Sequence, residues 1–324
     1  MLFDEIRVAT EAVASRARFV EIVDARLAEL ARELCDATSE PPALDPAHHY
    51  AGGESATLAF VVTLDAVNFG SGWFPFLAKL PGLSGYFTLA TCLKQRFESR
   101  GALSAEELSS LEAADCAEMF GQAAVFELPE VAELMKHFAV ALRDLGTLLT
   151  ERYAGRFEGL IAEASGSAER LARLLVEMPY YRDVSRYEEL EVPFYKRAQL
   201  TAADLAAAFR GQGFGAFRDL DSLTLFADNL VPHVLRREGV LRYDSGLAKR
   251  IDGGELLVPG SLEEVEIRAL AVHAVEQMVA VLRADARDPT RALTAQRLDT
   301  LLWNRGQRPD IKAHPRHRAR CVYY

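Results

Sequence analysis

Residues 222–243 read SLTLFADNLVPHVLRREGVLRY, and Asp228 lies at the centre of this largely apolar stretch. Its apolar residues recur at roughly helical spacing until Pro232 interrupts them, because proline removes a backbone donor and biases the preceding residue away from helical geometry. The pattern predicts one helix that ends near Asp228 and a second that begins near Pro232 and is closed by Gly239. Asp228 and Asn229 are therefore expected at a junction between two helices.

Asp228 is a carboxylate in apolar surroundings, and such a group must be hydrogen-bonded, paired with a cation or kept for chemistry. Residue types alone favour a hydrogen-bonded cap, because Asp and Asn are preferred at helix N-termini and the second helix starts just after them. A catalytic carboxylate is the alternative interpretation of the same position.

The composition bounds the class of protein. The chain has 324 residues, of which 50% are hydrophobic, which is enough for the core of one large domain over residues 1–324; a division into two packed lobes near residues 178–200 stays open. The net charge of −10 argues against a stable complex with nucleic acid, which requires a basic surplus.

The four cysteines show no metal-ligand spacing, so we expect neither a disulfide nor a metal site. The N-terminus lacks the pattern of a secretory signal, and no apolar run reaches the roughly 18 residues that a membrane span requires. These features predict a cytoplasmic protein.

Most of the sequence shows the periodicity or the capping residues of α-helices, about a dozen in all. Helices are predicted within 2–36, from 56, 104, 129, 167 and 198, over 261–282 and over 294–303. Tyrosine, arginine and β-branched residues are enriched in 178–200, where a small antiparallel ribbon is expected around 185–194. The basic and aromatic tail HPRHRARCVYY, residues 314–324, is expected to be docked. The fold class is mainly α with at most this one ribbon.

Two polar residues interrupt the apolar run TLAFVVTLDAVNF, residues 57–69. Asp65 and Asn68 are three residues apart, so on a helix they share one face, next to Phe69. Polar side chains on a buried helix need partners, which a cavity or a polar network could provide.

Three other groups have ordinary structural interpretations. His48 and His49 are adjacent, which is poor spacing for metal ligands, so we expect surface histidines. Residues 211–217, GQGFGAF, follow a helix rather than a strand and form a connection, not a phosphate loop. Glu264 and Arg268 are four residues apart and fit a solvated pair on one helix.

Several separated segments together resemble one family, the queuosine salvage proteins, which are queuosine 5′-phosphate N-glycosylase/hydrolases. The segments are FVVTLDAVNF with the aromatic turn 73–75, YYRDVSRYEELEVPFYKRAQLTAADL, LTLFADNLVPHVLRREGVLRY, GSLEEVEIRALAVHAVE, and LLWNRG with HRARCVYY, and they span residues 56–324. The chain departs from the family at Asn229–Leu230, where Tyr-Arg is common, and by inserting Gly70–Gly72 before the aromatic turn. The family's fold is similar to that of helix-hairpin-helix DNA glycosylases, which implies a helical domain.

The resemblance implies hydrolysis of the N-glycosidic bond of queuosine 5′-monophosphate to free queuine and ribose 5-phosphate, without a cofactor or metal. Such cleavage develops oxocarbenium character at the sugar, which a nearby carboxylate stabilises or attacks, and the resemblance places Asp228 in this role. Queuine is a 7-deazaguanine with carbon in place of N7. The base must therefore leave through hydrogen bonds to its polar edge.

The resemblance also assigns substrate contacts. Asp65 and Asn68 suit the guanine edge of the base. Four flat side chains are candidates for stacking on it: Phe69, Trp73, Phe226 and Trp303.

Lys196 and Arg197, with Tyr195 beside them, are expected to bind the 5′-phosphate, and the alternative for both cations is solvated surface charge. Glu266 is expected at the substrate site, with Glu264 and Arg268 supporting it.

The helix after Asp228 and the C-terminal tail contain further residues with expected roles. His233 is expected to cap or pack a helix start. His317, Arg320 and the terminal tyrosines are expected to close over the pocket or to anchor the tail.

Two other classes of function stay open. One is a glycosylase that acts on a base within DNA or RNA, against which the acidic net charge counts, since base flipping from a polymer needs many phosphate contacts. The other is a non-catalytic binder or carrier of the modified base. For an enzyme, covalent attack by Asp228 and a water-mediated step are both compatible with the sequence, as are nucleotide and nucleoside substrates and any oligomeric state.

Overall fold

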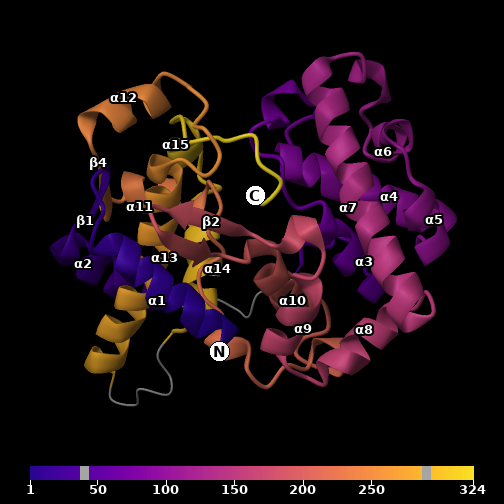
Figure 1. The fold of residues 1–324 in the computed structure, drawn as a ribbon, viewed down its shortest axis with the longest axis horizontal. Helices are drawn as coiled ribbons and strands as arrows, with labels where there is room; N and C mark the ends of the chain where they lie inside the picture. Colours follow the sequence, from indigo (N-terminus) through magenta and orange to yellow (C-terminus); the bar gives the residue numbers. More distant parts are fainter. Residues whose placement is uncertain (37–43, 287–292) are drawn as a thin grey trace. The chain divides into compact units, whose positions relative to one another are not determined.

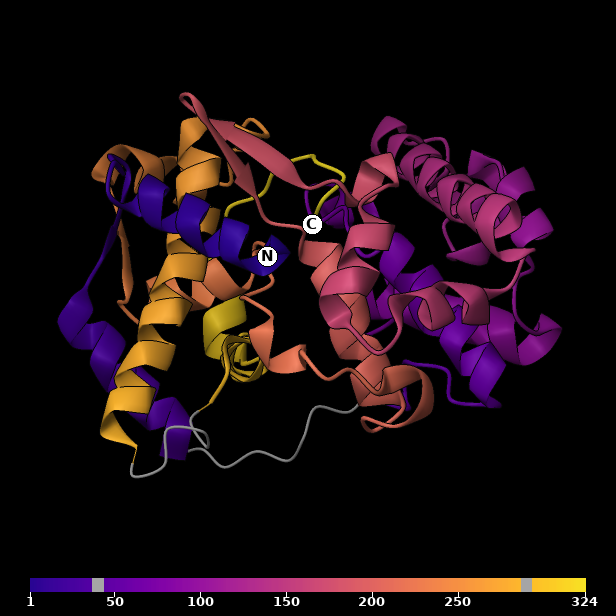
Figure 2. The same ribbon diagram turned by 60° about the horizontal axis from the view of Figure 1, so that its bottom comes forward.

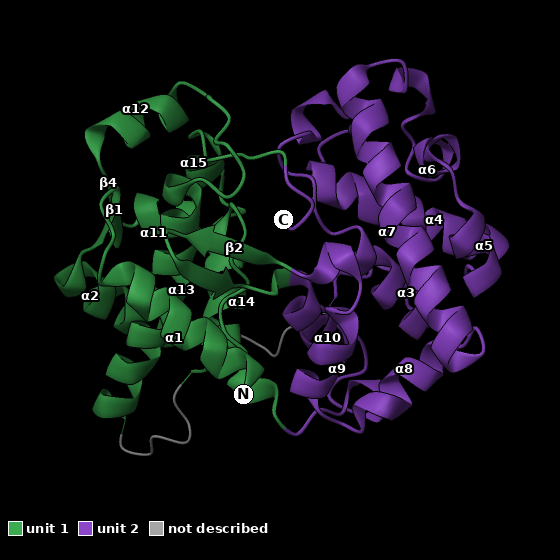
Figure 3. Cartoon of the chain, in the orientation of Figure 1, with its two compact units in different colours: residues 1–42, 183–196, 219–320 green, residues 43–182, 197–218, 321–324 purple. Residues whose placement is uncertain are grey.

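The computed structural model describes residues 1–36, 44–286 and 293–324 and shows a mainly α-helical chain (Figures 1 and 2). The chain divides into two compact units, coloured separately in Figure 3. The first unit comprises Met1–Pro42, Asp183–Lys196 and Asp219–Arg320, and the second comprises Ala43–Arg182, Arg197–Arg218 and Cys321–Tyr324. Each unit is therefore assembled from segments far apart in the sequence. The expectations of a single domain and of a helix-hairpin-helix likeness stay predictions.

The first unit is built around the long helix α13 (Leu262–Asp285), against which α1 (Leu2–Ala14) and α2 (Asp24–Asp36) pack. Residues 264–272 of α13 are all buried, so this helix forms the centre of the unit. The hydroxyl of Ser261 accepts the N–H of Glu264, which confirms the predicted cap at its N-terminus. The remaining helices of the unit are α11 (Val231–Arg237), α12 (Ser245–Asp252), α14 (Ala295–Arg305) and α15 (Pro309–Lys312).

Two antiparallel ribbons belong to the first unit. Strands β2 (Val184–Tyr187) and β3 (Leu190–Pro193) form the ribbon that the sequence predicts. Strands β1 (Val20–Ile22) and β4 (Leu241–Tyr243) form a second ribbon, where the prediction allowed one at most. Strands of three residues are too short to show a period of two, and residues 20–22 were absorbed into a predicted helical stripe.

The second unit contains α7 (Pro129–Tyr153) and the buried helix α3 (Glu54–Ala66), which pack against each other. Residues 57–66 of α3 are all buried, as expected for a helix that is apolar on every side. Its other helices are α4 (Gly85–Arg100), α5 (Ala105–Ser110), α6 (Ala113–Met119), α8 (Phe157–Ala164), α9 (Ala168–Leu175) and α10 (Lys196–Ala208), whose first residue lies in the first unit. Capping by Ser104 and Ser167 and the position of Pro129 in the first turn of α7 are confirmed.

Short 3₁₀ helices connect these elements at Phe74–Phe76, Ala123–Val125, Pro179–Tyr181, Gly213–Gly215 and Leu220–Ser222. In the described ranges no helix combines the length and the apolar character needed to cross a bilayer. The tail is docked as predicted: His317, Ala319, Cys321 and Tyr324 are buried.

The predicted helix before Asp228 is wrong. Residues 223–227 are not helical, although each of them is buried. Their backbone groups find partners on other elements: Phe226 N donates to Asp299 Oδ1 at 3.1 Å, and Ala227 O accepts from Arg268 Nε at 3.0 Å. Because the segment is buried on every side, its apolar residues also fit the spacing of a helix. Long-range hydrogen bonds satisfy its backbone in place of helical ones. Beyond Asp228 the prediction is confirmed, because α11 begins at Val231 and Gly239 follows its end with φ +79°.

Candidate active site

Asp228 is half-buried and precedes α11. Its Oδ1 accepts the N–H groups of Leu230 at 2.8 Å and Val231 at 2.9 Å, which satisfies two donors at the start of the helix. In the described part of the chain Oδ2 has no hydrogen-bond partner. The capping interpretation is therefore correct, but it occupies only one oxygen. The other oxygen is held in a fixed orientation at a partly accessible position.

A buried ion pair supports the Asp228 turn from behind. Arg268 Nε donates to Ala227 O, and its two terminal nitrogens donate to Asp183 Oδ1 at 3.1 Å and Oδ2 at 2.6 Å. The guanidinium also lies 3.9 Å from the centre of the Phe194 ring. Arg268 and Asp183 are 1% and 2% exposed, so the pair lies outside bulk solvent and positions the backbone next to Asp228 rigidly.

The expectation of a solvated Glu264–Arg268 pair is wrong. Glu264 is 2% exposed, and its Oε1 lies 3.7 Å from Arg268, farther than Asp183. Sequence reasoning missed Asp183, which lies 85 residues from its partner and shows no local pattern.

Asp183 also organises the segment that holds Lys196. Its Oδ2 accepts the N–H of Lys196 at 3.3 Å, and its carbonyl oxygen accepts the N–H of Phe194 at 2.9 Å and of Tyr195 at 3.3 Å. Tyr195 is half-buried with φ +47°. This left-handed backbone conformation is unfavourable for a tyrosine and persists only where surrounding contacts hold it. Lys196 is 6% exposed, so the solvated alternative is wrong for it. Asp183 thus connects the predicted phosphate ligand to the Asp228 turn within one unit.

Arg197 belongs to the second unit and is an anchor. It is 1% exposed, and its guanidinium donates to the carbonyl oxygens of Ala66 and Val322, at 2.5 and 3.0 Å, and to that of Tyr180. It also lies 4.8 Å from the centre of the Phe69 ring. Its donors point to main-chain oxygens at the end of α3 and in the tail. Solvated surface charge is therefore wrong for Arg197, and a structural role explains it better than a phosphate contact.

Asp65 and Asn68 do not share a helical face, because α3 ends at Ala66. Asp65 is fully buried in the last turn, and Asn68 is half-buried beyond the end of the helix. Burial raises the pKa of Tyr86, and the charges of Asp204 and then of Asp65 raise it further.

Trp73 is 2% exposed and lies in an aromatic cluster of the second unit. Its Nε1 donates to Glu133 Oε2 at 2.7 Å, and its ring lies 5.5 Å from that of His137. His137 Nδ1 in turn lies 2.9 Å from the hydroxyl of Tyr180, whose ring is 6.1 Å from Phe69. Glu133 and His137 lie one turn apart on α7, and sequence reasoning did not single them out.

Glu266, which is expected at the substrate site, is bound by groups of the fold. It is fully buried, and its carboxylate accepts the N–H groups of Arg18, Phe19 and Val20 and the hydroxyl of Tyr187. These donors surround both oxygens, so Glu266 holds the start of β1 against α13.

The other two predicted residues of the first unit are Phe226, which is 5% exposed, and Trp303, which is half-buried on α14. Trp303 is the more accessible of these two candidate stacking surfaces.

The histidines are buried more deeply than expected. His49 is 6% exposed and its Nε2 lies 2.9 Å from the hydroxyl of Tyr86, so the surface prediction is wrong for it, while His48 is half-buried beside Thr91. His233 Nε2 lies 3.1 Å from Ile311 O, and burial lowers the pKa of His233 to about 4. Its packing role at the start of α11 is confirmed.

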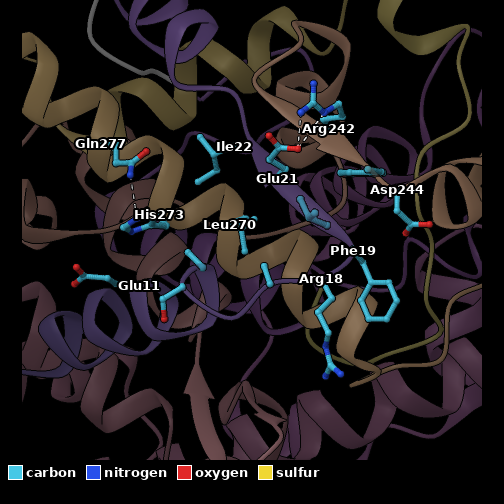
Figure 4. A pocket seen from close by; sticks show the side chains of 15 residues that line it. Glu11, Arg18, Phe19, Glu21, Ile22, Arg242, Asp244, Leu270, His273 and Gln277 are labelled. Carbon is cyan, nitrogen blue, oxygen red and sulfur yellow. Dashed lines mark hydrogen bonds and ion pairs between the residues drawn. The ribbon is translucent and has the colours of Figure 1, made fainter.

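A separate cavity of about 670 Å³ lies in the first unit and contains none of the predicted site residues (Figure 4). It is lined by α1, the β1–β4 ribbon and α13, and its Glu21 and Arg242 form an ion pair with each other. No cluster of three or more His, Cys, Asp or Glu side chains suited to a metal ion occurs in the described ranges.

The sequence model of the queuosine salvage protein family matches residues 48–324. The chain belongs to the queuosine salvage protein family. A protein of Sphaerobacter thermophilus named queuosine 5′-phosphate N-glycosylase/hydrolase is 38% identical over 97% of this chain and 96% of its own length. Proteins of the same name from Mus musculus and Bos taurus are 31% and 37% identical, over 84% and 56% of this chain and 83% and 56% of their own lengths. The resemblance found in the sequence is thereby confirmed.

Proposed function

We propose that this protein hydrolyses the N-glycosidic bond of queuosine 5′-monophosphate and releases queuine and ribose 5-phosphate, with Asp228 as the carboxylate beside the anomeric carbon. Full-length similarity to relatives that carry this name supports the reaction. The observation that carries the role of Asp228 is the division of labour between its oxygens, one bound to the start of α11 and one without a partner among the described residues.

The geometry suits a reaction that builds positive charge on the sugar. Two backbone N–H groups fix Oδ1, so Oδ2 does not have to reorient when the glycosidic bond breaks. A charge that is already oriented stabilises an oxocarbenium-like transition state better than a mobile one. Either direct attack by Oδ2 or electrostatic stabilisation while water attacks follows from this placement.

The substrate contacts are part of the proposal. For the base we retain Phe226 and Trp303, the two stacking candidates in the unit that contains Asp228. For the phosphate we retain Lys196 and Tyr195, which Asp183 holds in place. Arg197 and Glu266 are left out, because their donors and acceptors already serve the fold.

The reaction as proposed uses water as its only co-substrate, and it takes place in the cytoplasm on the free nucleotide. The test is mass-spectrometric detection of free queuine after incubation of the purified protein with queuosine 5′-monophosphate, queuosine and guanosine 5′-monophosphate in parallel. Release from the queuosine compounds alone supports the proposal. Binding of queuine without any release would favour the carrier function, and release from an intact polymer would favour a nucleic-acid glycosylase.

A further inference from the structure

The segment 311–317 comprises the last two residues of α15 and the five residues after it, and it lies against α11. His233 Nε2 contacts Ile311 O at 3.1 Å, and Arg237 contacts His314 Nε2 at 3.0 Å. At its far end, Asn229 Nδ2 donates to His317 O at 3.3 Å. Asn229 directly follows Asp228, so the chain around His317 lies beside the Asp228 turn.

Arg316 occupies this place and is half-buried. Other half-buried arginines of the first unit have clear partners: Arg236 pairs with Asp252, and Arg318 donates to Gly254 O. For Arg316, in contrast, no hydrogen bond or ion pair is found among residues 1–36, 44–286 and 293–324. A guanidinium has five N–H donors, and leaving them unsatisfied at a partly buried position is costly unless a ligand uses them.

The electrostatics around Arg316 are consistent with an anion site. The Asn229–His317 hydrogen bond places Arg316 beside the Asp228 turn, and no ion pair between Arg316 and Asp228 is found in the described ranges. Burial lowers the pKa of Arg316, and the negative charge of Asp228 opposes this shift. Burial and then the charge of Arg316 lower the pKa of Lys312, so a second cation lies close by. An anion bound here would relieve the repulsion between the two cations.

We propose that Arg316 binds the 5′-phosphate of the substrate and carries the preference for a nucleotide over a nucleoside. In a nucleoside 5′-monophosphate the phosphate and the anomeric carbon are separated by the ribose ring. A cation that is near Asp228 but not paired with it fits this separation, with Asp228 at the anomeric carbon and Arg316 at the phosphate. The planar guanidinium can contact two phosphate oxygens at once.

This inference rests on the proposed function and adds a residue that the sequence did not single out. Lys196 remains a second phosphate ligand on another segment of the same unit. Arg316 differs from it in exposure, because Arg316 is half-buried whereas Lys196 is 6% exposed.

The test is steady-state kinetics of wild type, Arg316→Ala and Arg316→Lys with queuosine 5′-monophosphate and with queuosine. We expect Arg316→Ala to lower kcat/KM for the nucleotide on the order of 10- to 100-fold, the effect of losing charge-assisted hydrogen bonds, and to leave that for the nucleoside nearly unchanged. Arg316→Lys retains the charge and should lose less. Binding of inorganic phosphate, measured by calorimetry without turnover, should weaken in Arg316→Ala.

Arg237→Ala is the matched control. It removes the same charge from an exposed residue of α11 that also contacts the segment 311–317. It should leave both substrates nearly unaffected. Equal losses for nucleotide and nucleoside in Arg316→Ala, or unchanged binding of inorganic phosphate, would overturn the assignment while the wild-type activity stands. If the wild type releases queuine from neither substrate, the proposed function itself fails.

Discussion

Breaking the Asp183–Arg268 pair should destabilise the first unit more than any exposed ion pair does. Asp183→Asn retains the shape of the side chain but leaves the guanidinium of Arg268 without its bidentate partner. Removal of one member of a buried pair costs about 3–5 kcal/mol. Because Glu264 Oε1 lies 3.7 Å from Arg268 and offers partial compensation, we place Asp183→Asn near the lower end, about 3 kcal/mol.

Arg268→Met should cost more, near the upper end of about 5 kcal/mol, because it leaves two buried carboxylates, Asp183 and Glu264, without their cation. It also removes the donor to Ala227 O, so the Asp228 turn should loosen and kcat should fall.

Urea denaturation gives the free energy of unfolding for both variants, with an unchanged m-value as the sign of two-state behaviour. The control is Arg242→Met, which breaks the exposed pair with Glu21 and should leave the free energy of unfolding nearly unchanged. A loss below about 1 kcal/mol in Asp183→Asn, or a smaller loss in Arg268→Met than in Asp183→Asn, would refute the reasoning.

Two further stability predictions follow from the buried polar groups. The folded-state pKa of His233 is about 4, below the ordinary value near 6.5, so below pH 6.5 the unfolded chain binds a proton that the folded chain refuses. The contribution of His233 to the free energy of unfolding is therefore fully present above pH 6.5 and is lost as the pH falls towards 4. At pH 5 the loss amounts to roughly 2 kcal/mol. Urea denaturation at pH 7 and pH 5 should show this slope, and His233→Gln should flatten it; an equal slope in both proteins would contradict the assignment. Arg197→Met removes donors to four main-chain carbonyls and should destabilise the second unit by about 3 kcal/mol or more, measured by thermal denaturation beside the exposed control Arg173→Met. A melting temperature equal to that of the control would show that Arg197 is not an anchor.

Local signals predicted most of the fold. The caps at Ser104, Ser167 and Ser261 and the long apolar run of α3 specify their helices without reference to the rest of the chain. Residues 223–227 could not be assigned in this way, because burial on every side gives no periodicity that distinguishes an irregular segment from a buried helix. The β1–β4 ribbon pairs residues more than 200 positions apart, and its strands are too short to leave a pattern.

The site was predictable at Asp228 and less so around it. Capping and catalysis appeared as alternatives in the sequence, whereas the structure assigns one oxygen to the cap and leaves the other without a partner in the described ranges. Glu266 and Arg197 carry the charges that a substrate site needs, but their partners are backbone groups that no sequence pattern marks. Arg316 lies in the tail, where the sequence singles out His317, Arg320 and the terminal tyrosines but not Arg316.

The most direct test of the account is queuine release by Asp228→Asn under single-turnover conditions, together with calorimetric binding of queuosine 5′-monophosphate. Asparagine retains an oxygen that can accept the N–H groups of Leu230 and Val231, so the cap, the fold and substrate binding should survive. Only the negative charge is lost. We predict that the rate of release falls by at least about 100-fold while the nucleotide still binds. Release at the wild-type rate from a folded Asp228→Asn protein would contradict the catalytic role of Asp228.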